Sequence, residues 1–332
     1  MLTPRVWAFL VCMVIGVWRY LRINNQGLAR TFLFVVCRKK KSKMDLDLRV
    51  INFPDKVFKK YLIDNFDKDD DGEISLTEAL AITKVLCSQR GIKSIAGIEY
   101  LSNLEILDCS RNNLEYIDIS KNKALRHLSC YRNPLKNNLD IQNNHSLISL
   151  YCRECNLNYL NCLNNKNLKI LSCGFNPLEY INLSNNRELT MLSVRRCKLD
   201  ELDVHSLKKL QILDCSENQL YSIDIQANKE LVSLDCACND LHHDLYLGSN
   251  LKLKDLDCRK NINLYSITIS DGQYIDNVQS NIRPTTISYR QYLEWREYKE
   301  EQLKDSWNDK EDWEDQRIDA FEGDESNYWN ID

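Results

Sequence analysis

The chain has 332 residues, of which 43% are hydrophobic and 28% are charged, with a formal net charge of −4. The hydrophobic share is enough for a folded core, and only 9 Gly and 5 Pro argue against a fibrous or disordered chain. The charges are polarised. Residues 1–43 hold nine Arg and Lys and no acid, whereas residues 301–332 hold twelve Asp and Glu against three Lys and Arg. The nearly neutral body between them gives no support to a dedicated nucleic-acid-binding protein.

The basic first segment, residues 1–43, contains a short apolar run at residues 6–18. This run is shorter than the roughly 20 residues that cross a membrane, and it resembles the core of a signal peptide. No small-residue cleavage site follows this run. The basic residues 38–43 favour a cytoplasmic location for the chain on the C-terminal side of the apolar segment. Two interpretations stay open. Either the segment is a signal or anchor that touches the membrane only through residues 6–18 of a cell-envelope or surface protein, or translation starts at Met44 and the protein is cytoplasmic.

Residues 67–78 match the twelve-residue calcium-binding loop of an EF-hand at each diagnostic position. Carboxylates stand at loop positions 1, 3 and 5, and Gly72 allows the sharp turn at position 6. Position 7 offers its backbone carbonyl, and position 12 offers a bidentate carboxylate. Oxygen ligands in this number favour Ca²⁺ over Mg²⁺. The predicted metal ligands are Asp67, Asp69, Asp71, Glu73, Ser75 and Glu78.

Helices are predicted on both sides of this loop, so residues 50–90 are interpreted as an EF-hand-like helix-loop-helix cap. Apolar residues between Val57 and Phe66 fall on one side of the incoming helix, and an exit helix is expected over residues 76–87. The sequence contains no second loop of this kind. We therefore expect weak binding of Ca²⁺, with a dissociation constant of about 10⁻⁴ to 10⁻³ M. The bound ion is expected to stiffen the cap over the first edge of the repeats.

One phrase, Leu-x-x-Leu-x-Cys, occurs eight times between Leu104 and Cys258 at intervals of 21 or 22 residues, with Val194 replacing one Cys. A fixed period of this length indicates a solenoid, in which each repeat must stack on its neighbours. The alternation of apolar residues predicts a short strand with one buried face. The second half of each repeat, such as residues 114–119, alternates as well. We therefore expect a right-handed coil with two parallel β walls, the first of them eight strands wide.

The same repeat explains most of the fourteen cysteines. A position that accepts both Cys and Val is inward, small and apolar, so we predict reduced, buried thiols rather than disulfides or a zinc site. Three residues after it, an Asn is expected to satisfy backbone groups at the turn, with Cys155 and Cys197 replacing it in two repeats. The cysteines of the predicted ladder are Cys109, Cys130, Cys152, Cys173, Cys215, Cys236 and Cys258.

These features resemble a bacterial leucine-rich-repeat protein with short 21-residue repeats, and residues 92–104 are similar to the first repeat of internalin-like surface proteins. The resemblance covers about residues 50–270. It implies an α/β solenoid with parallel β walls, in which residues 91–270 form the repeat domain. The internalin-like family also uses an EF-hand-shaped cap without metal over its first repeat. A metal-free cap is therefore the alternative for residues 50–90.

In leucine-rich repeats, the outward residues of the first strand line a concave face. In five successive repeats, the two residues after the Cys position supply Arg and aromatic side chains, the types enriched in binding hot spots. Acidic residues from Asp214 to Asp257 follow on the same face. We predict a protein or glycan partner with an acidic surface, the alternative being an ordinary solvated face. The predicted partner-binding residues are Arg111, Tyr131, Arg132, Arg153, Phe175, Arg195 and Arg196.

Residues 271–332 are predicted to form a C-terminal cap helix, over residues 288–319, and an acidic tail. None of the five histidines lies in a catalytic motif and there is no Gly-rich phosphate loop, so no enzyme is predicted. The leading interpretation is a monomeric, non-enzymatic recognition scaffold with a calcium-stabilised cap. The alternative is an intracellular structural or assembly protein that recruits partners through its acidic aromatic tail.

Overall fold

The computed structural model describes residues 49–136, 139–270 and 273–280. Residues 1–43, the predicted helix over residues 288–319 and the acidic tail lie outside the described residues. The helices and strands are α3 (Lys56–Phe66), α4 (Leu76–Ala79), β1 (Lys84–Leu86), the 3₁₀ helix η1 (Ile98–Tyr100), β2 (Ile106–Asp108), β3 (His127–Ser129), β4 (Ser149–Tyr151), β5 (Ile170–Ser172), β6 (Met191–Ser193), β7 (Ile212–Asp214), β8 (Ser233–Asp235), β9 (His243–Tyr246), β10 (Asp255–Asp257), β11 (Leu264–Thr268) and β12 (Asn277–Gln279).

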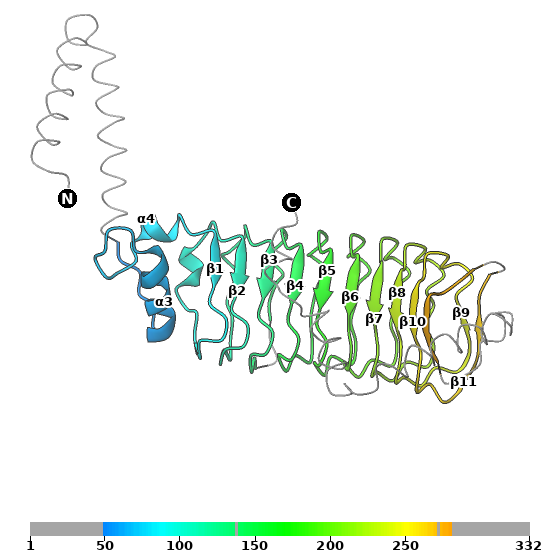
Figure 1. The fold of residues 1–332 in the computed structure, drawn as a ribbon. Helices are drawn as coiled ribbons and strands as arrows, with labels where there is room; N and C mark the ends of the chain where they lie inside the picture. Colours follow the sequence, from blue (N-terminus) through cyan, green and yellow to red (C-terminus); the bar gives the residue numbers. More distant parts are fainter. Residues whose placement is uncertain (1–48, 137–138, 271–272, 281–332) are drawn as a thin grey trace, which may run out of the picture.

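A long parallel sheet runs along one side of the solenoid, and α3 and α4 lie beyond its β1 end (Figure 1). Its strand order is β1-β2-β3-β4-β5-β6-β7-β8-β10-β12. Equivalent repeat positions pair with one another, so Leu107 lies beside Leu128 and Leu128 beside Leu150. The eight predicted strands are confirmed as β2 to β8 and β10, and one strand is added at each end.

The predicted exit helix over residues 76–87 is wrong. Helix α4 ends at Ala79, and Val85 lies in β1 beside Leu107. Ile82, Val85 and Cys87 occupy the repeat positions of two leucines and a cysteine, and their side chains are at most 3% exposed. Burial of these side chains and backbone pairing with β2 stabilise a strand here more than a helix that would end in solvent.

The second parallel wall is also wrong for most repeats. Among the described residues, only β9 and β11 pair on that side. In six other repeats an Asp or Asn accepts a hydrogen bond from the N–H two residues on, as from Ser120 to Asp118 Oδ1 at 3.0 Å. This contact makes a turn, which still directs Ile117 and Ile119 inward. The fold is therefore a β-solenoid with few helices, not an α/β coil with two continuous walls.

The core is one continuous apolar cluster that contains the predicted cysteine ladder. All seven predicted ladder cysteines are at most 2% exposed, and every described cysteine is a free thiol. Cys87 lies in the same row as these cysteines. It follows β1, which pairs with β2, and its N–H donates to the carbonyl of Asp108, the residue before Cys109. Burial raises the pKa of Cys87 to about 12 and that of Cys258 to about 11. These thiols stay protonated at neutral pH, which makes them poor nucleophiles and poor metal ligands.

The predicted role of the turn asparagines is confirmed. The Nδ2 of Asn176 donates to the carbonyls of Cys152 at 2.8 Å and Cys173 at 2.9 Å. Its Oδ1 accepts the N–H groups of Cys155 and Leu157, both at 2.9 Å. One buried amide thus joins two neighbouring turns. Where Cys155 replaces Asn, its Sγ still donates to the carbonyl of Cys130 at 3.1 Å.

Candidate functional site

In the long sheet, each strand from β1 to β8, and β10, leads into a turn that holds one side chain in a left-handed backbone conformation. The sheet hydrogen bonds continue into these turns, as from the N–H of Phe175 to the carbonyl of Arg195 at 2.7 Å. Glycine is the residue of lowest strain in this conformation, yet none of the described repeats uses it there. A side chain is therefore kept at this edge despite the strain. The residues with positive φ at this position are Gln89, Arg111, Arg132, Glu154, Phe175, Arg196, Glu217, Cys238 and Lys260.

Replacing Arg196 with Gly is expected to leave the free energy of unfolding unchanged or to raise it by up to about 1 kcal/mol. The relief of the left-handed strain opposes the higher entropy that glycine gives the unfolded chain. The side chain of Arg196 is 65% exposed, so little packing is lost. Urea denaturation of the two proteins measures the difference. A loss above about 1 kcal/mol would show that Arg196 has a structural role.

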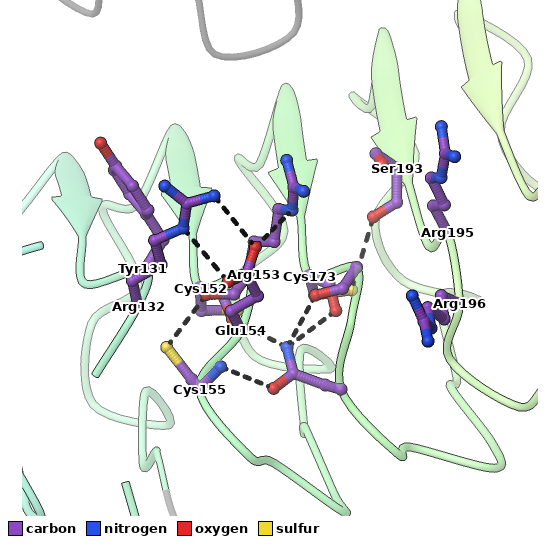
Figure 2. A network of polar contacts seen from close by, with 12 residues as sticks. Tyr131, Arg132, Cys152, Arg153, Glu154, Cys155, Cys173, Ser193, Arg195 and Arg196 are labelled. Carbon is purple, nitrogen blue, oxygen red and sulfur yellow. Dashed lines mark hydrogen bonds and ion pairs between the residues drawn. The ribbon is translucent and has the colours of Figure 1, made fainter. Parts of the chain in front are cut away.

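The seven predicted partner-binding residues lie together along one edge of the sheet face. We call them the arginine stripe. They come from the turns after five neighbouring strands, β2 to β6. Figure 2 shows Tyr131, Arg132, Arg153, Arg195 and Arg196 in the turns that follow β3, β4 and β6. The stripe consists of Arg111, Tyr131, Arg132, Arg153, Phe175, Arg195 and Arg196.

Phe175 lies at the centre of the stripe. The guanidinium carbon of Arg153 lies 4.2 Å from the centroid of its ring, that of Arg196 lies 5.5 Å away and that of Arg195 lies 5.9 Å away. At these distances the negative face of an aromatic ring attracts a cation. These contacts restrain three long side chains around one ring.

Two glutamates that were not predicted as site residues complete the stripe. Glu154 pairs with Arg132 at 3.1 Å and with Arg153 at 3.2 Å (Figure 2). Glu217 pairs in the same way with Arg195, and with Arg196 at 4.0 Å. Each glutamate therefore lies between two guanidinium groups. Five arginines against two glutamates leave the stripe with a formal net charge of +3.

Gly174 occupies the repeat position that holds Tyr131, Arg153 and Arg195 in neighbouring repeats, and it lies between the repeats of Arg153 and Arg195. A Cβ atom there would lie 2.9 Å from the backbone carbonyl of Arg195, which is too close for any other residue without a backbone shift. The row that contains Tyr131, Arg153 and Arg195 is thus interrupted at this repeat. Arg153 and Arg195 come from the repeats on either side of this position, and both guanidinium groups lie within about 6 Å of the centroid of the Phe175 ring.

The predicted calcium loop follows α3 and gathers three carboxylates. One oxygen each from Asp67, Asp69 and Asp71 lies within 4.8 Å of the other two. The N–H of Gly72 donates to Oδ2 of Asp67 at 2.8 Å, which orients this carboxylate. The other oxygen, Oδ1, is inaccessible to solvent and meets no well-aligned hydrogen-bond donor among the described residues. A buried oxygen of this kind is stabilised by a cation, so these residues fit a metal site.

The other predicted ligands are engaged within the loop. The carboxylate of Glu73 pairs with Lys59 at 2.6 Å, so the predicted ligand atom at this position is the backbone carbonyl. Ser75 and Glu78 form a capping box at the start of α4. Glu78 accepts both the N–H and the hydroxyl of Ser75 at 2.9 Å, and the N–H of Lys68 at 2.7 Å. To reach a metal, Ser75 and Glu78 would have to exchange these contacts for the ion.

The loop is held to the solenoid by the chain segment that precedes α3. Ile51 donates its N–H to the carbonyl of Ile74 at 2.9 Å, and Leu76 donates to Arg49 at the same distance. Val50 and Ser75 form an antiparallel bridge, and the side chain of Ile74 is fully buried. Residues 49–51 therefore occupy the edge at which a second calcium loop would pair. A single loop is stabilised in this way without a partner loop.

Comparisons with known proteins identify the fold. No family model matches the chain, and no curated protein matches its sequence. Internalin C2 of Listeria monocytogenes superposes with a TM-score of 0.51 at 20% identity, over 66% of this chain and 94% of that one. The internalin inlF of the same bacterium gives 0.51 at 19% identity, over 71% and 92%. The leucine-rich-repeat ectodomain of the receptor kinase GASSHO1/SCHENGEN3 from Arabidopsis thaliana gives 0.50 at 19%, over 64% and 32%. The chain has a leucine-rich-repeat fold.

The leucine-rich-repeat fold confirms the resemblance seen in the repeats, and it gives the arginine stripe a place on the sheet face. A shallow cavity of about 450 Å³ lies at the opposite edge of the strands, with Glu105, Arg126, Lys169 and Glu188 in its lining. Its acidic and basic groups are equal in number, so it has no net attraction for an anion. Within the described part of the leucine-rich-repeat chain, no helix has the length and apolar character needed to cross a membrane.

Beyond the stripe, the sheet face of the leucine-rich-repeat solenoid is acidic. Asp214, Asp235 and Asp257 lie on neighbouring strands and are 5%, 9% and 4% exposed. Asp214 closes its own turn by accepting the N–H of Ser216 at 3.0 Å and the hydroxyl at 2.6 Å. Desolvation by burial raises the pKa of Asp214 above its ordinary value of 3.8, against the effect of these hydrogen bonds. Asp214 thus has a structural role that is costly when the carboxylate is charged.

Replacing Asp214 with Asn is expected to stabilise the protein at pH 7. The pKa of Asp214 is raised in the folded state, so the folded state binds the proton more tightly than the unfolded chain. The free energy of unfolding of the wild type therefore falls as the pH rises from the unfolded pKa through the folded pKa of this carboxyl. The Asn variant lacks this loss and keeps an oxygen for Ser216. The difference in free energy of unfolding between the Asn variant and the wild type should shrink as the pH falls below about 4, where Asp214 is protonated in both states. A variant less stable than wild type at pH 7 would contradict this assignment.

Proposed function

We propose that this protein is a non-enzymatic recognition scaffold that binds a protein or glycan with an acidic surface on its arginine stripe. The observation that carries the proposal is the placement of three guanidinium groups around Phe175, two of which also share Glu217. Arginine and aromatic side chains dominate binding hot spots. The plant leucine-rich-repeat ectodomain was solved in complex with CASPARIAN STRIP INTEGRITY FACTOR 2, which supports the use of such a solenoid for binding.

The geometry suggests how an acidic partner would bind. A carboxylate or sulfate of the partner would approach Arg153 and Arg195, where Gly174 leaves the row without a side chain. Planar guanidinium groups can offer two parallel N–H donors to such an anion. Glu154 and Glu217 hold the arginines in place before binding and reject ligands that bring no negative charge. Apolar groups of the partner would pack on Phe175 and Tyr131.

Panning a random peptide library against the full-length protein tests this proposal. Wild type is expected to enrich peptides rich in Asp and Glu, and R132A/R153A/R195A to lose that enrichment. The matched control is K121A/K123A/K166A, which removes the same charge from turns that precede the strands and should behave as wild type. Because the Arg153 side chain is only 13% exposed and packs on Phe175, urea denaturation must show that both triple variants are folded under the panning conditions. Equal enrichment of acidic peptides by wild type and by R132A/R153A/R195A would contradict the proposal.

We further propose that the loop binds Ca²⁺ through Asp67, Asp69, Asp71, the carbonyl of Glu73, Ser75 and Glu78. The convergence of three carboxylates and the solvent-inaccessible Oδ1 of Asp67 support this. The ion would supply the positive charge that offsets repulsion among the carboxylates. Since residues 49–51 tie the loop to the core, ion binding would stabilise the end of the solenoid at β1.

A further inference from the structure

We propose that the acidic C-terminal segment of this chain, residues 301–332, occupies the arginine stripe when no partner is bound. The inference rests on the proposed function of the stripe and names a resident ligand for it. A partner would then have to displace this segment. The chain would carry its own competitor, which lowers the apparent affinity for acidic ligands.

Charge and residue type match between the two surfaces. The segment holds twelve Asp and Glu against three Lys and Arg, and residues 311–325 hold eight of these acids with Arg317 as the single base. The stripe has a net charge of +3 and presents Phe175 and Tyr131. The segment also brings aromatic residues among its acids. These are Trp307, Trp313, Phe321, Tyr328 and Trp329.

The connection is long enough for this contact. The described chain ends at residue 280, directly after β12, and the stripe lies beside β2 to β6 of the same sheet. Five strand spacings separate β12 from β5, about 24 Å, and eight separate it from β2, about 38 Å. The twenty residues 281–300 can span up to about 66 Å when extended. Residues 301–332 can therefore reach every part of the stripe.

The charge gradient along the sheet favours the stripe over nearer positions. Between β12 and the stripe, the segment would first pass Asp257, which pairs with Arg259 at 2.8 Å, and then Asp235 and Asp214, which repel it. A tethered segment has an effective concentration on the order of millimolar, so even a millimolar contact is half occupied. Contacts of this kind between exposed charges weaken as salt is added. The occupancy should therefore be reversible and sensitive to ionic strength.

Tryptophan fluorescence can detect the contact in the full-length chain, because the described residues contain no tryptophan. The six tryptophans are Trp7, Trp18, Trp295, Trp307, Trp313 and Trp329. In a W7F/W18F background, the remaining signal comes from the C-terminal region alone. We expect a red shift of the emission maximum and stronger acrylamide quenching in R132A/R153A/R195A and at high salt. The K121A/K123A/K166A control should keep the wild-type spectrum.

Cross-linking locates the contact. Arg196→Lys keeps the charge and introduces an amine into a stripe that contains no lysine. Zero-length carbodiimide coupling should then join this amine to a carboxylate within residues 301–332 of the same monomer, as identified by mass spectrometry. Three results would overturn the proposal: no such cross-link together with an unshifted emission maximum, cross-links from the segment only to Lys121, Lys123 or Lys166, or cross-links only between two copies.

Peptide panning separates a failure of this inference from a failure of the proposed function. In E311Q/D312N/E314Q/D315N the competing segment is weakened, so enrichment of acidic peptides should exceed that of wild type. If wild type enriches acidic peptides but the segment shows no cross-link and no effect on enrichment, only the intramolecular contact is wrong. If neither wild type nor this variant enriches acidic peptides, the binding role of the stripe is wrong as well.

Discussion

Replacing Asn176 with Leu is expected to lower the free energy of unfolding by about 4 kcal/mol. The amide is fully buried and makes hydrogen bonds to two carbonyls and two N–H groups in neighbouring turns. Leucine satisfies none of them, and each buried polar group left without a partner costs about 1 to 3 kcal/mol. Relaxation of the turns would reduce the sum. Urea denaturation measures the loss as a shift of the unfolding midpoint, provided that the dependence of the free energy of unfolding on urea concentration is the same in both proteins.

The natural control is Asn176→Cys, because the chain already uses cysteine at this position in the repeats on either side. Cys155 donates to the carbonyl of Cys130 at 3.1 Å, and Cys197 donates to that of Cys173 at 3.4 Å. The cysteine variant should therefore lose clearly less stability than the leucine variant. Equal losses would mean that the volume of the side chain, not its hydrogen bonds, holds the turns together.

Calcium at about 2 mM is expected to raise the free energy of unfolding by roughly 0.6 to 1.8 kcal/mol over that in chelator, for a dissociation constant of about 10⁻³ to 10⁻⁴ M. The folded loop holds one oxygen each of Asp67, Asp69 and Asp71 within 4.8 Å of one another, so we expect the ion to bind the folded state more tightly than the unfolded chain. Thermal unfolding at matched ionic strength measures the effect. Mg²⁺ at the same concentration should have a smaller one, because it requires a tighter octahedral site.

Asp69→Asn should reverse the order of stability between the two conditions. Without calcium the variant should be at least as stable as wild type, because one of three neighbouring charges is removed. With calcium it should be less stable, because a charged ligand is lost. If calcium does not shift wild type at all, the loop is a metal-free cap, as in the alternative that the family resemblance implies.

The solenoid could be predicted from the sequence because the same residue types occur at fixed intervals. The end strands β1 and β12 were missed because Ile82, Val85 and Val278 stand where the other repeats have leucine. The exit helix was predicted from local sequence, which does not reveal that Val85 pairs with a neighbouring strand. The second wall was predicted from alternation, but a turn closed by Asp118 directs side chains inward with the same spacing.

The stripe residues could be named from the sequence because their position in the repeat places them on one edge. Their pairing could not, because Glu154 and Arg132 are brought together only when neighbouring turns stack in register. The three arginines around Phe175 depend on the same stacking. The convergence of Asp67, Asp69 and Asp71 could be predicted from their spacing alone. Its attachment to residues 49–51 could not, because these residues match no motif.

The most direct test of the arginine stripe as a binding site is arginine footprinting with an acidic peptide selected by panning. The full-length protein is treated with phenylglyoxal with and without the peptide, and modification of each arginine is measured by mass spectrometry. Bound peptide should protect Arg153 and Arg195 and leave exposed Arg187, in a turn before β6, unchanged. Protection of Arg187 with no change at Arg153 and Arg195 would place binding elsewhere and contradict the proposed function.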